Sequence, residues 1–140
     1  ELSALVFIFE TQSRRQGRDI RLTVTDEVPE TLKLDSQRLR QCLANLIGNA
    51  IKHAPAGPVT ATVGYAPPNL VVEVTDEGPG VPSEFQDRIF EPFFRGSTDS
   101  PGVGLGLAIS RALAKQMGGD LILMPNGRGA TFRLTVKAPE

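Results

Sequence analysis

Hydrophobic and polar positions change their spacing along the first third of the chain, and each change predicts an element. Residues 3–16 fit a helix that stops at Gly17. Residues 19–26 alternate with a period of two, which is typical of a strand with one buried face. The period becomes 3.6 after Asp35, a good helix N-cap, and persists to about His53. The pattern therefore predicts a helix, a strand and a second helix in that order.

The helix expected at 35–53 has one apolar face and one polar stripe. Its core face is predicted to consist of Leu39, Cys42, Leu43, Leu46, Ile47 and Ala50. The polar stripe carries Asn45, Asn49 and Lys52. A solvated face is the ordinary interpretation of such a stripe. Asparagine is a mediocre helix former, however, so two of them on one line make a functional surface a real alternative.

The rest of the chain predicts strands that arrive as hairpins, with helices between them. The expected elements are strands at 59–65 and 70–76, a short helix at 82–89, a loop at 96–102, a helix at 105–117, and strands at 120–124 and 130–136. Helices segregated from hairpin strands favour an α+β fold, a two-layer α/β sandwich in which helices cover one face of a mixed sheet. A length of 140 residues fits one domain over residues 1–140.

Composition narrows the classes of partner. The chain has 15 basic and 16 acidic residues and a formal net charge of −1, which argues against a nucleic-acid binder or a polybasic membrane anchor. One cysteine, Cys42, and one histidine, His53, exclude an internal disulfide and leave too few ligands for a structural zinc site. The longest apolar run, at 5–9, is far shorter than the roughly 20 residues that span a bilayer. These observations predict a soluble piece in a reducing, cytoplasmic setting.

Two glycine clusters bracket an aromatic segment and indicate a ligand that touches the main chain. The first cluster runs from Asp76 to Gly80 and the second from Gly102 to Leu107. Glycines at alternate positions remove the Cβ atoms that would keep a backbone away from a flat ring or a phosphate. The second cluster leads directly into the helix at 105–117, whose free N–H groups and positive dipole end favour an anion. The simplest ligand is a phosphate chain.

Five short motifs then follow one another in an order known from one enzyme family. They are Asn45–Pro55 (NLIGNAIKHAP), Asp76–Gly80 (DEGPG), Phe90–Arg95 (FEPFFR), Gly102–Leu107 (GVGLGL) and Gly129–Phe132 (GATF). In this order they closely resemble the catalytic ATP-binding domain of sensor histidine kinases, over nearly the whole chain. The resemblance implies the Bergerat fold of the gyrase, chaperone, MutL and histidine kinase ATPases, with ATP and Mg²⁺ as ligands. That fold agrees with the layering predicted above.

The resemblance assigns nucleotide contacts residue by residue. They fall on Asn49, Asp76, Gly78, Gly80, Phe90, Gly102, Gly104, Leu105, Gly106 and Thr131. Asp76 would accept a hydrogen bond from the adenine 6-amino group, because a carboxylate accepts but cannot donate and would be repelled by the O6 of guanine. The structural alternative is an aspartate that simply ends a strand before a glycine.

Metal and catalytic roles follow from the same resemblance. Asn49 matches a Mg²⁺ ligand, an amide oxygen for a hard cation that otherwise keeps waters and phosphate oxygens. Lys52 and Arg95 match phosphate-binding cations, although an exposed loop arginine is an equally common explanation for Arg95. At the position of Asn45 the hydrolytic relatives carry a water-activating glutamate, and an amide cannot act as a general base. The resemblance therefore implies phosphoryl transfer rather than hydrolysis, with Asn45, Lys52 and Arg95 as the catalytic set.

The departures from the family pattern are small. Phe94 stands where the family often has tyrosine, and Glu77 where it often has asparagine. The loop at 96–101 is short, which leaves open how an ATP lid, expected at 95–103, would behave. Aromatic residues at close spacing usually pack together, so Phe90, Phe93 and Phe94 are expected to form a hydrophobic plug that anchors the lid rather than a stacking platform.

Other enzyme classes fit the sequence less well. There is no G-x-x-x-x-G-K-[ST] motif, and the second glycine cluster has the spacing G-x-G-x-G rather than that of a Rossmann fingerprint. A Ser-His-Asp hydrolase would have only His53 and no G-x-S-x-G elbow. Two alternatives stay open: an anti-sigma-factor type serine kinase, which usually keeps the glutamate that Asn45 replaces, and a nucleotide-binding module without catalysis.

The resemblance also implies partners outside this chain. His53 lies about 40° past Asn49 on the helical projection, so it is not expected to present its ring to a γ-phosphate. The acceptor histidine is expected on a dimerisation and phosphoacceptor hairpin of the same protein, followed by the helix at 1–17, with a response regulator downstream. On this interpretation the chain is a piece cut after that hairpin. It should be monomeric and slow to hydrolyse ATP on its own.

Overall fold

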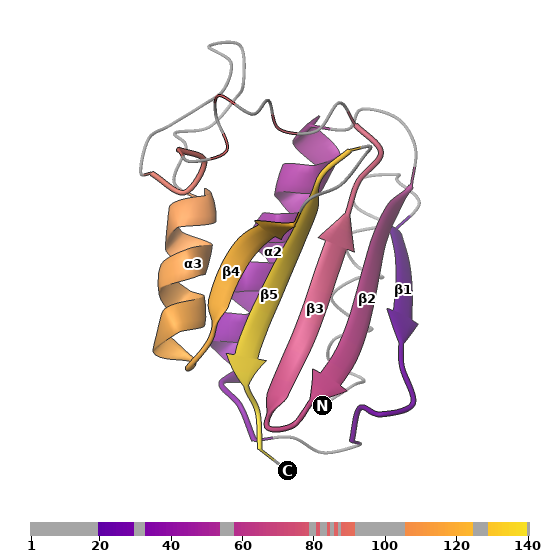
Figure 1. Cartoon of the computed structure of the whole chain (residues 1–140), viewed down its shortest axis with the longest axis vertical. Coiled ribbons are helices and arrows are strands. Elements are labelled where there is room, and N and C mark those ends of the chain that lie inside the picture. Colours follow the sequence, from indigo (N-terminus) through magenta and orange to yellow (C-terminus); the bar gives the residue numbers. More distant parts are fainter. Residues whose placement is uncertain are drawn as a thin grey trace.

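The chain forms two layers, a mixed β-sheet and helices that cover one of its faces (Figure 1). The computed structural model describes residues 20–29, 33–53, 58–78, 81, 84, 86, 88–91, 106–124 and 129–139, and only the backbone of Ser36, Lys52 and His53. The elements are β1 (Ile20–Val24), α2 (Ser36–His53), β2 (Val59–Ala66), β3 (Asn69–Thr75), α3 (Gly106–Gln116), β4 (Asp120–Met124) and β5 (Thr131–Lys137). A helix able to span a bilayer is not found among these residues. The helix predicted at 3–16 lies outside them.

The sheet has the strand order β1-β2-β3-β5-β4. β1 pairs in parallel with β2, and α2 lies in the crossover between them, whereas the β2–β3, β3–β5 and β4–β5 pairs are antiparallel. The last strand of the chain, β5, therefore lies inside the sheet between β3 and β4. Its first residue, Thr131, is opposite Thr75, the last residue of β3. The predicted α+β fold with a mixed sheet is confirmed.

Most of the predicted elements agree with the structure to within one or two residues at each end. The short helix predicted at 82–89 is wrong for the residues described there, because Glu84, Gln86 and 88–90 lie in turns. The N–H of Glu91 donates to the carbonyl of Arg88 at 2.9 Å, which is the spacing of a turn. So short a helix has too few hydrogen bonds to offset the cost of its first turn unless it packs firmly on a core.

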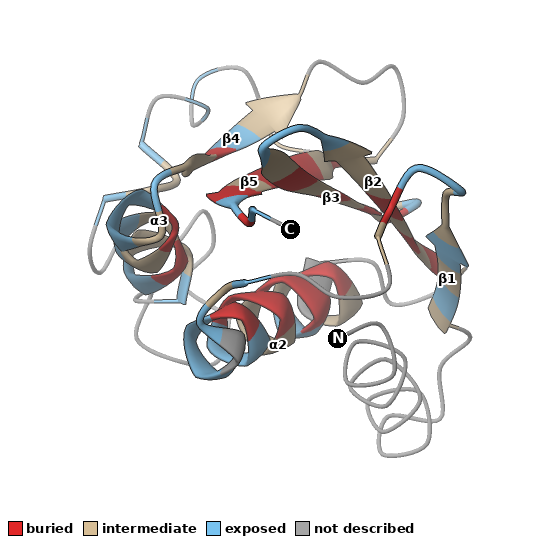
Figure 2. Ribbon diagram, turned by 90° about the horizontal axis from the view of Figure 1, so that it is seen from below, coloured by how far each residue is buried: buried red, intermediate tan, exposed pale blue. Residues whose placement is uncertain are grey.

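One hydrophobic core fills the space between the layers (Figure 2). The six residues predicted for the core face of α2 are all buried, with no more than 4% exposure. They face the inward residues of the three central strands, which are Val59, Ala61, Val63, Leu70, Val72, Val74, Phe132, Leu134 and Val136. Residues between these in sequence point to the other face of the sheet. There Arg133 and Glu73 form an ion pair of 2.7 Å across neighbouring strands.

α3 ends at two glycines, as the sequence predicted. Gly118 has a φ of +80°, in the left-handed region that favours glycine. The N–H groups of Gly118 and Gly119 donate to the carbonyls of Lys115 and Ala114 at 3.1 and 2.9 Å, which satisfies the end of the helix. A Cβ on Gly119 would lie 1.6 Å from the carbonyl oxygen of Thr135 in β5. The second glycine therefore lets the end of α3 lie directly against the sheet.

Cys42 gives the core a measurable pH dependence. Its side chain is fully buried on α2, and burial raises the pKa of the thiol from 9.0 to about 11. Because the folded-state pKa lies above the unfolded one, this contribution to stability is complete below pH 9.0 and is lost as the pH rises through about 11. The expected loss is roughly 2–3 kcal/mol.

In Cys42→Ala the free energy of unfolding should fall less between pH 9.0 and about 11 than it does in the parent, because the variant has no thiol to ionise. Urea unfolding of the parent and the variant, repeated from neutral pH to about pH 11, measures the difference between the two slopes. Equal slopes would contradict the prediction.

Candidate functional site

The candidate residues gather at the end of the sandwich where β3 ends and α3 begins, at the top of Figure 1. Asp76 follows β3, and Thr131 opens β5. The C-terminal half of α2 carries Asn45 and Asn49, and Gly106 is the first residue of α3. Four elements that are far apart in sequence thus contribute to one end of the molecule.

Asp76 is buried, and main-chain groups hold its carboxylate. The residue is 3% exposed. Its Oδ1 accepts hydrogen bonds from the N–H of Gly78 at 2.9 Å and of Ala130 at 3.3 Å, while its own N–H donates to the carbonyl of Ala130 at 3.0 Å. Within the described part of the chain both bonds to the carboxylate use Oδ1, which leaves Oδ2 for a ligand. The bond from Gly78, two residues later, is also what an aspartate that ends a strand in a turn would make, so the binding role of Asp76 stays a prediction.

Gly129 brings the start of β5 into contact with Asp76. It has a φ of +67°, and a Cβ there would lie 2.0 Å from the carbonyl oxygen of Asp76. Another residue would push this backbone away and break the bond from Ala130 to the carboxylate. Gly129 opens the last of the five sequence motifs, but no role was predicted for it from the sequence.

A pair of hydroxyl groups joins the end of β3 to the start of β5 on the face of the sheet away from α2. Thr75 and Thr131 lie opposite each other on β3 and β5, with their hydroxyl oxygens 3.0 Å apart. Hydroxyl groups both donate and accept, so the pair can adapt to either kind of polar group on a ligand. Thr75 and Thr131 alternate with the inward residues Val74 and Phe132, so their hydroxyl groups lie on the other face of the sheet, and a contact between Thr131 and a nucleotide stays a prediction.

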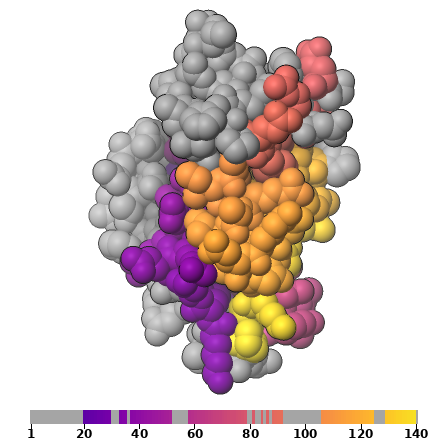
Figure 3. All heavy atoms as spheres, turned by 90° about the vertical axis from the view of Figure 1, so that its left-hand side faces the viewer, coloured from indigo at the N-terminus to yellow at the C-terminus, as the bar shows by residue number. Residues whose placement is uncertain are grey.

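Asn45 faces α3, which lies beside α2 in the space-filling view of Figure 3. Its Nδ2 donates to the hydroxyl of Ser110 at 3.0 Å and to the carbonyl of Gly106 at 3.4 Å. A carbonyl can only accept, so the nitrogen of the amide must be on this side and Oδ1 on the other. Asn45 and Asn49 are both half-buried. The polar stripe of α2 is therefore not a simple solvated face.

Asn49 lies one turn after Asn45 and is the residue predicted to bind Mg²⁺. An amide oxygen is a suitable ligand for this hard cation, which often takes only one or two protein ligands and completes its shell with water and phosphate oxygens. No group of three or more His, Cys, Asp or Glu side chains that could hold a metal occurs among the residues that the structure describes. This donor set fits an ion that arrives largely with a phosphate ligand.

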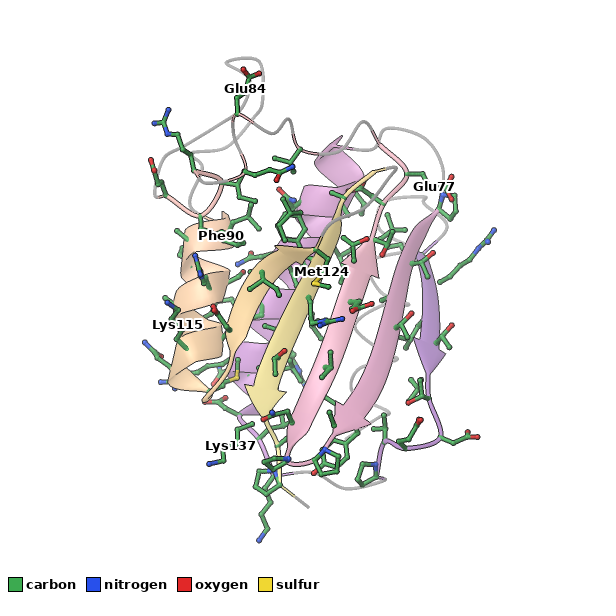
Figure 4. The ribbon with its side chains drawn as sticks, viewed as in Figure 1. Glu77, Glu84, Phe90, Lys115, Met124 and Lys137 are labelled. Carbon is green, nitrogen blue, oxygen red and sulfur yellow. The ribbon has the colours of Figure 1, made fainter. Side chains whose placement is uncertain are left out.

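Phe90 packs against protein groups at the N-terminal end of α3, where Figure 4 labels it. Its ring meets that of Phe132 edge-on, with the centroids 6.1 Å apart and an interplanar angle of 90°. On α3, the Cζ atom of Arg111 lies 4.7 Å from the centroid of the Phe90 ring, a cation–π contact. These contacts favour the hydrophobic plug over a stacking platform. A contact between Phe90 and a nucleotide stays a prediction.

Arg111 also ties α3 to the start of β4. Its Nε donates to Oδ1 of Asp120 at 3.1 Å. Burial alone would raise the pKa of Asp120, but the hydrogen bonds from Arg111 and the N–H of Leu121, together with the charges of Arg111 and Lys115, outweigh burial and lower it. An ion pair this exposed adds little stability. Its main effect is to hold the guanidinium over Phe90.

Some predicted residues lie outside the described part of the chain. They are Gly80, Arg95, Gly102, Gly104, Leu105 and the side chain of Lys52. Their roles stay predictions, as does the ATP lid at 95–103.

The structure also brings forward residues that the sequence analysis did not assign, which are Ser110, Arg111, Gly129 and Ala130. Ser110 was detectable, because a serine on the buried stripe of an amphipathic helix breaks the apolar pattern. Ala130 acts through its main chain, so its residue type carried no signal.

Comparisons with known proteins agree with this arrangement. The family described as "Histidine kinase-, DNA gyrase B-, and HSP90-like ATPase" matches residues 34–140. The chain is 40% identical over 135 residues to the aerobic respiration control sensor protein ArcB of Escherichia coli, and 37% identical over 130 residues to the sensor protein KdpD of Mycobacterium tuberculosis. These matches cover 91% and 90% of the chain but only 17% and 15% of the relatives. The chain thus spans about a sixth of their length.

Solved structures share the fold. The crystal structure of full-length ShkA in complex with AMPPNP matches with a TM-score of 0.85 and 36% identity, over 98% of this chain and 30% of that one. The nucleotide-free catalytic domain of the histidine kinase ThkA matches with a TM-score of 0.78 and 29% identity, over 96% of this chain and 88% of that one. The layers, the sheet and the polar end described above therefore belong to a known architecture.

Proposed function

This chain belongs to the family of histidine kinase-, DNA gyrase B- and HSP90-like ATPases, and on that basis we propose that it binds Mg-ATP and donates the γ-phosphoryl group to a histidine. The acceptor lies on a separate dimerisation domain of the same protein, which acts in two-component signal transduction. The observation that carries the proposal is the buried carboxylate of Asp76, held on one oxygen by main-chain donors. The AMPPNP complex of ShkA supports it, because AMPPNP is an analogue of ATP.

Recognition of adenine falls to Asp76. With Oδ1 engaged by Gly78 and Ala130, Oδ2 accepts from the adenine 6-amino group and would repel the O6 of guanine. Gly129 keeps the carboxylate in place by allowing the backbone of β5 to approach it.

Recognition of the phosphates falls to the start of α3 and the polar stripe of α2. Gly106 is the first residue of α3, and a Cβ added to it would meet no described atom within 4 Å. As far as the described residues show, a phosphate could therefore approach the first turn closely. Asn49 would hold Mg²⁺ through its amide oxygen, and Lys52, Arg95, Gly102 and Gly104 complete the proposed set.

Asn45 favours transfer over hydrolysis. An amide cannot take a proton from water, and the Nδ2 of Asn45 is engaged with α3. This disfavours the serine kinase alternative, whose members usually carry glutamate at this position.

The proposed partners are the phosphoacceptor hairpin of the same protein and a downstream response regulator. ATP is made and used in the cytoplasm, so the domain is proposed to act there. Alone, it should be monomeric and should release phosphate slowly, because an amide at position 45 cannot activate water and the acceptor histidine is proposed to lie on another domain.

A phosphotransfer assay tests the proposal. The chain is incubated with γ-labelled ATP and Mg²⁺, alone and then mixed with a phosphoacceptor hairpin. We expect label on the hairpin in the mixture only, and none when its acceptor histidine is replaced. Label on His53 of this chain alone, or rapid release of phosphate, would overturn the assignment.

A further inference from the structure

Ser110 is a buried polar residue between two helices. It is 0% exposed, and Asp76 is the other buried polar residue in the described part of the chain. The Ser110 hydroxyl accepts a hydrogen bond from Asn45 at 3.0 Å, and its carbonyl accepts one from the thiol of Cys42 at 3.5 Å. Two residues of α2, about one turn apart, thus bond to a single residue of α3.

The hydrogen bonds from Asn45 join α2 to the first turn of α3. Gly106 begins this helix, and Ser110 follows it four residues later. The Nδ2 of Asn45 reaches both, at 3.4 Å to the carbonyl of Gly106 and 3.0 Å to the hydroxyl of Ser110. One amide group therefore spans the turn, and its donors are committed to α3 while Oδ1 is presented on the opposite side.

We propose that Ser110 is a positioning residue for the triphosphate, an inference that rests on the proposed function. Its hydroxyl holds the start of α3, which would face the phosphates, at a set distance from Asn49 on α2. Without the hydroxyl, Asn45 keeps only the longer bond to the carbonyl of Gly106. The first turn of α3 is then free to shift relative to the metal ligand, which moves the phosphate-binding N–H groups away from their working positions.

The adenine end of the site does not depend on this contact. Asp76 is held by Gly78 and by Ala130 at the start of β5, and neither bond involves α2 or α3. Loss of the Ser110 hydroxyl should therefore weaken the binding of a triphosphate more than the binding of adenosine. A residue that only stabilised the fold would affect both ligands alike.

Calorimetric titration with Mg-ATP and with adenosine tests the proposal in the parent, Ser110→Ala and Ser110→Thr. Ser110→Ala should bind Mg-ATP about fivefold more weakly, the effect of one neutral hydrogen bond, and adenosine less than about twofold more weakly. Ser110→Thr, which restores the hydroxyl, should recover most of the loss. Val136→Ala is the control, because Val136 is equally buried on β5 and its loss should lower stability without changing the ratio of the two affinities.

A spectroscopic measurement gives an independent readout. The side-chain N–H₂ signals of Asn45 in an NMR spectrum should be protected from exchange in the parent and lose that protection in Ser110→Ala. An unchanged ratio of affinities in Ser110→Ala, or an equal loss for both ligands, would overturn the role of Ser110 while leaving the proposed function intact. A parent that bound neither ligand would contradict the proposed function itself.

Discussion

Asp76→Asn is expected to weaken ATP binding about 150-fold without unfolding the domain. The Oδ1 of asparagine can keep both main-chain bonds, from Gly78 and Ala130, so the local structure should persist. The second oxygen, however, becomes an N–H₂ group that meets the adenine 6-amino group, and two donors cannot bond each other. Loss of the charge-assisted bond and the mismatch together amount to about 3 kcal/mol. Titration calorimetry with Mg-ATP measures the change.

GTP provides the matched control for this substitution. An asparagine Nδ2 at this position can donate to the O6 of guanine, so Asp76→Asn should reduce the preference for ATP over GTP rather than lower both affinities equally. The thermal unfolding midpoint should stay close to that of the parent. A variant that bound ATP as tightly as the parent would show that Asp76 does not contact the base.

Gly119→Ala is expected to destabilise the domain by about 3 kcal/mol. A Cβ there would lie 1.6 Å from the carbonyl oxygen of Thr135, 2.4 Å from its carbonyl carbon and 3.0 Å from the Cα of Val136. All three atoms belong to the backbone of β5, so no side-chain rotation can relieve the overlap. Either the end of α3 or the central strand must move.

Gly48→Ala is the matched comparison, because Gly48 is exposed on α2 and a Cβ there would meet no described atom within 4 Å. Alanine is the better helix former, so this variant should be more stable than the parent by about 0.5–1 kcal/mol. Urea unfolding of both variants gives the two free energies. Similar stabilities for Gly119→Ala and Gly48→Ala would refute the close contact between α3 and β5.

Elements whose hydrophobic residues recur at a regular spacing were predictable from the sequence. The 3.6 period of α2 identified its six core residues, and the two-residue period at 19–26 identified β1. The helix predicted at 82–89 was wrong because the local composition suits a helix, whereas the described residues of this segment form turns. A helix that short is not stable without firm packing.

Contacts between distant residues were not predictable in the same way. The hydrophobic pattern placed Asn45 on a polar stripe. It could not show that Gly106 and Ser110, more than 60 residues later, accept hydrogen bonds from its amide. Likewise, Gly129 is required by the backbone of Asp76, and only the pairing of β3 with β5 brings the two together. For Asp76 the sequence predicted the position just after a strand correctly, whereas its contact with adenine stays a prediction.

The position of β5 inside the sheet has a consequence for synthesis on the ribosome. This strand is the last of the described strands to leave the exit tunnel, yet it joins β3 to β4 and directly follows Ala130, a main-chain donor to Asp76. Before Thr131 has emerged, β3 has a bare edge and β4 has no partner. The nascent chain must therefore stay in an open state, with an unpaired strand edge that chaperones can bind, until nearly the whole domain has been made.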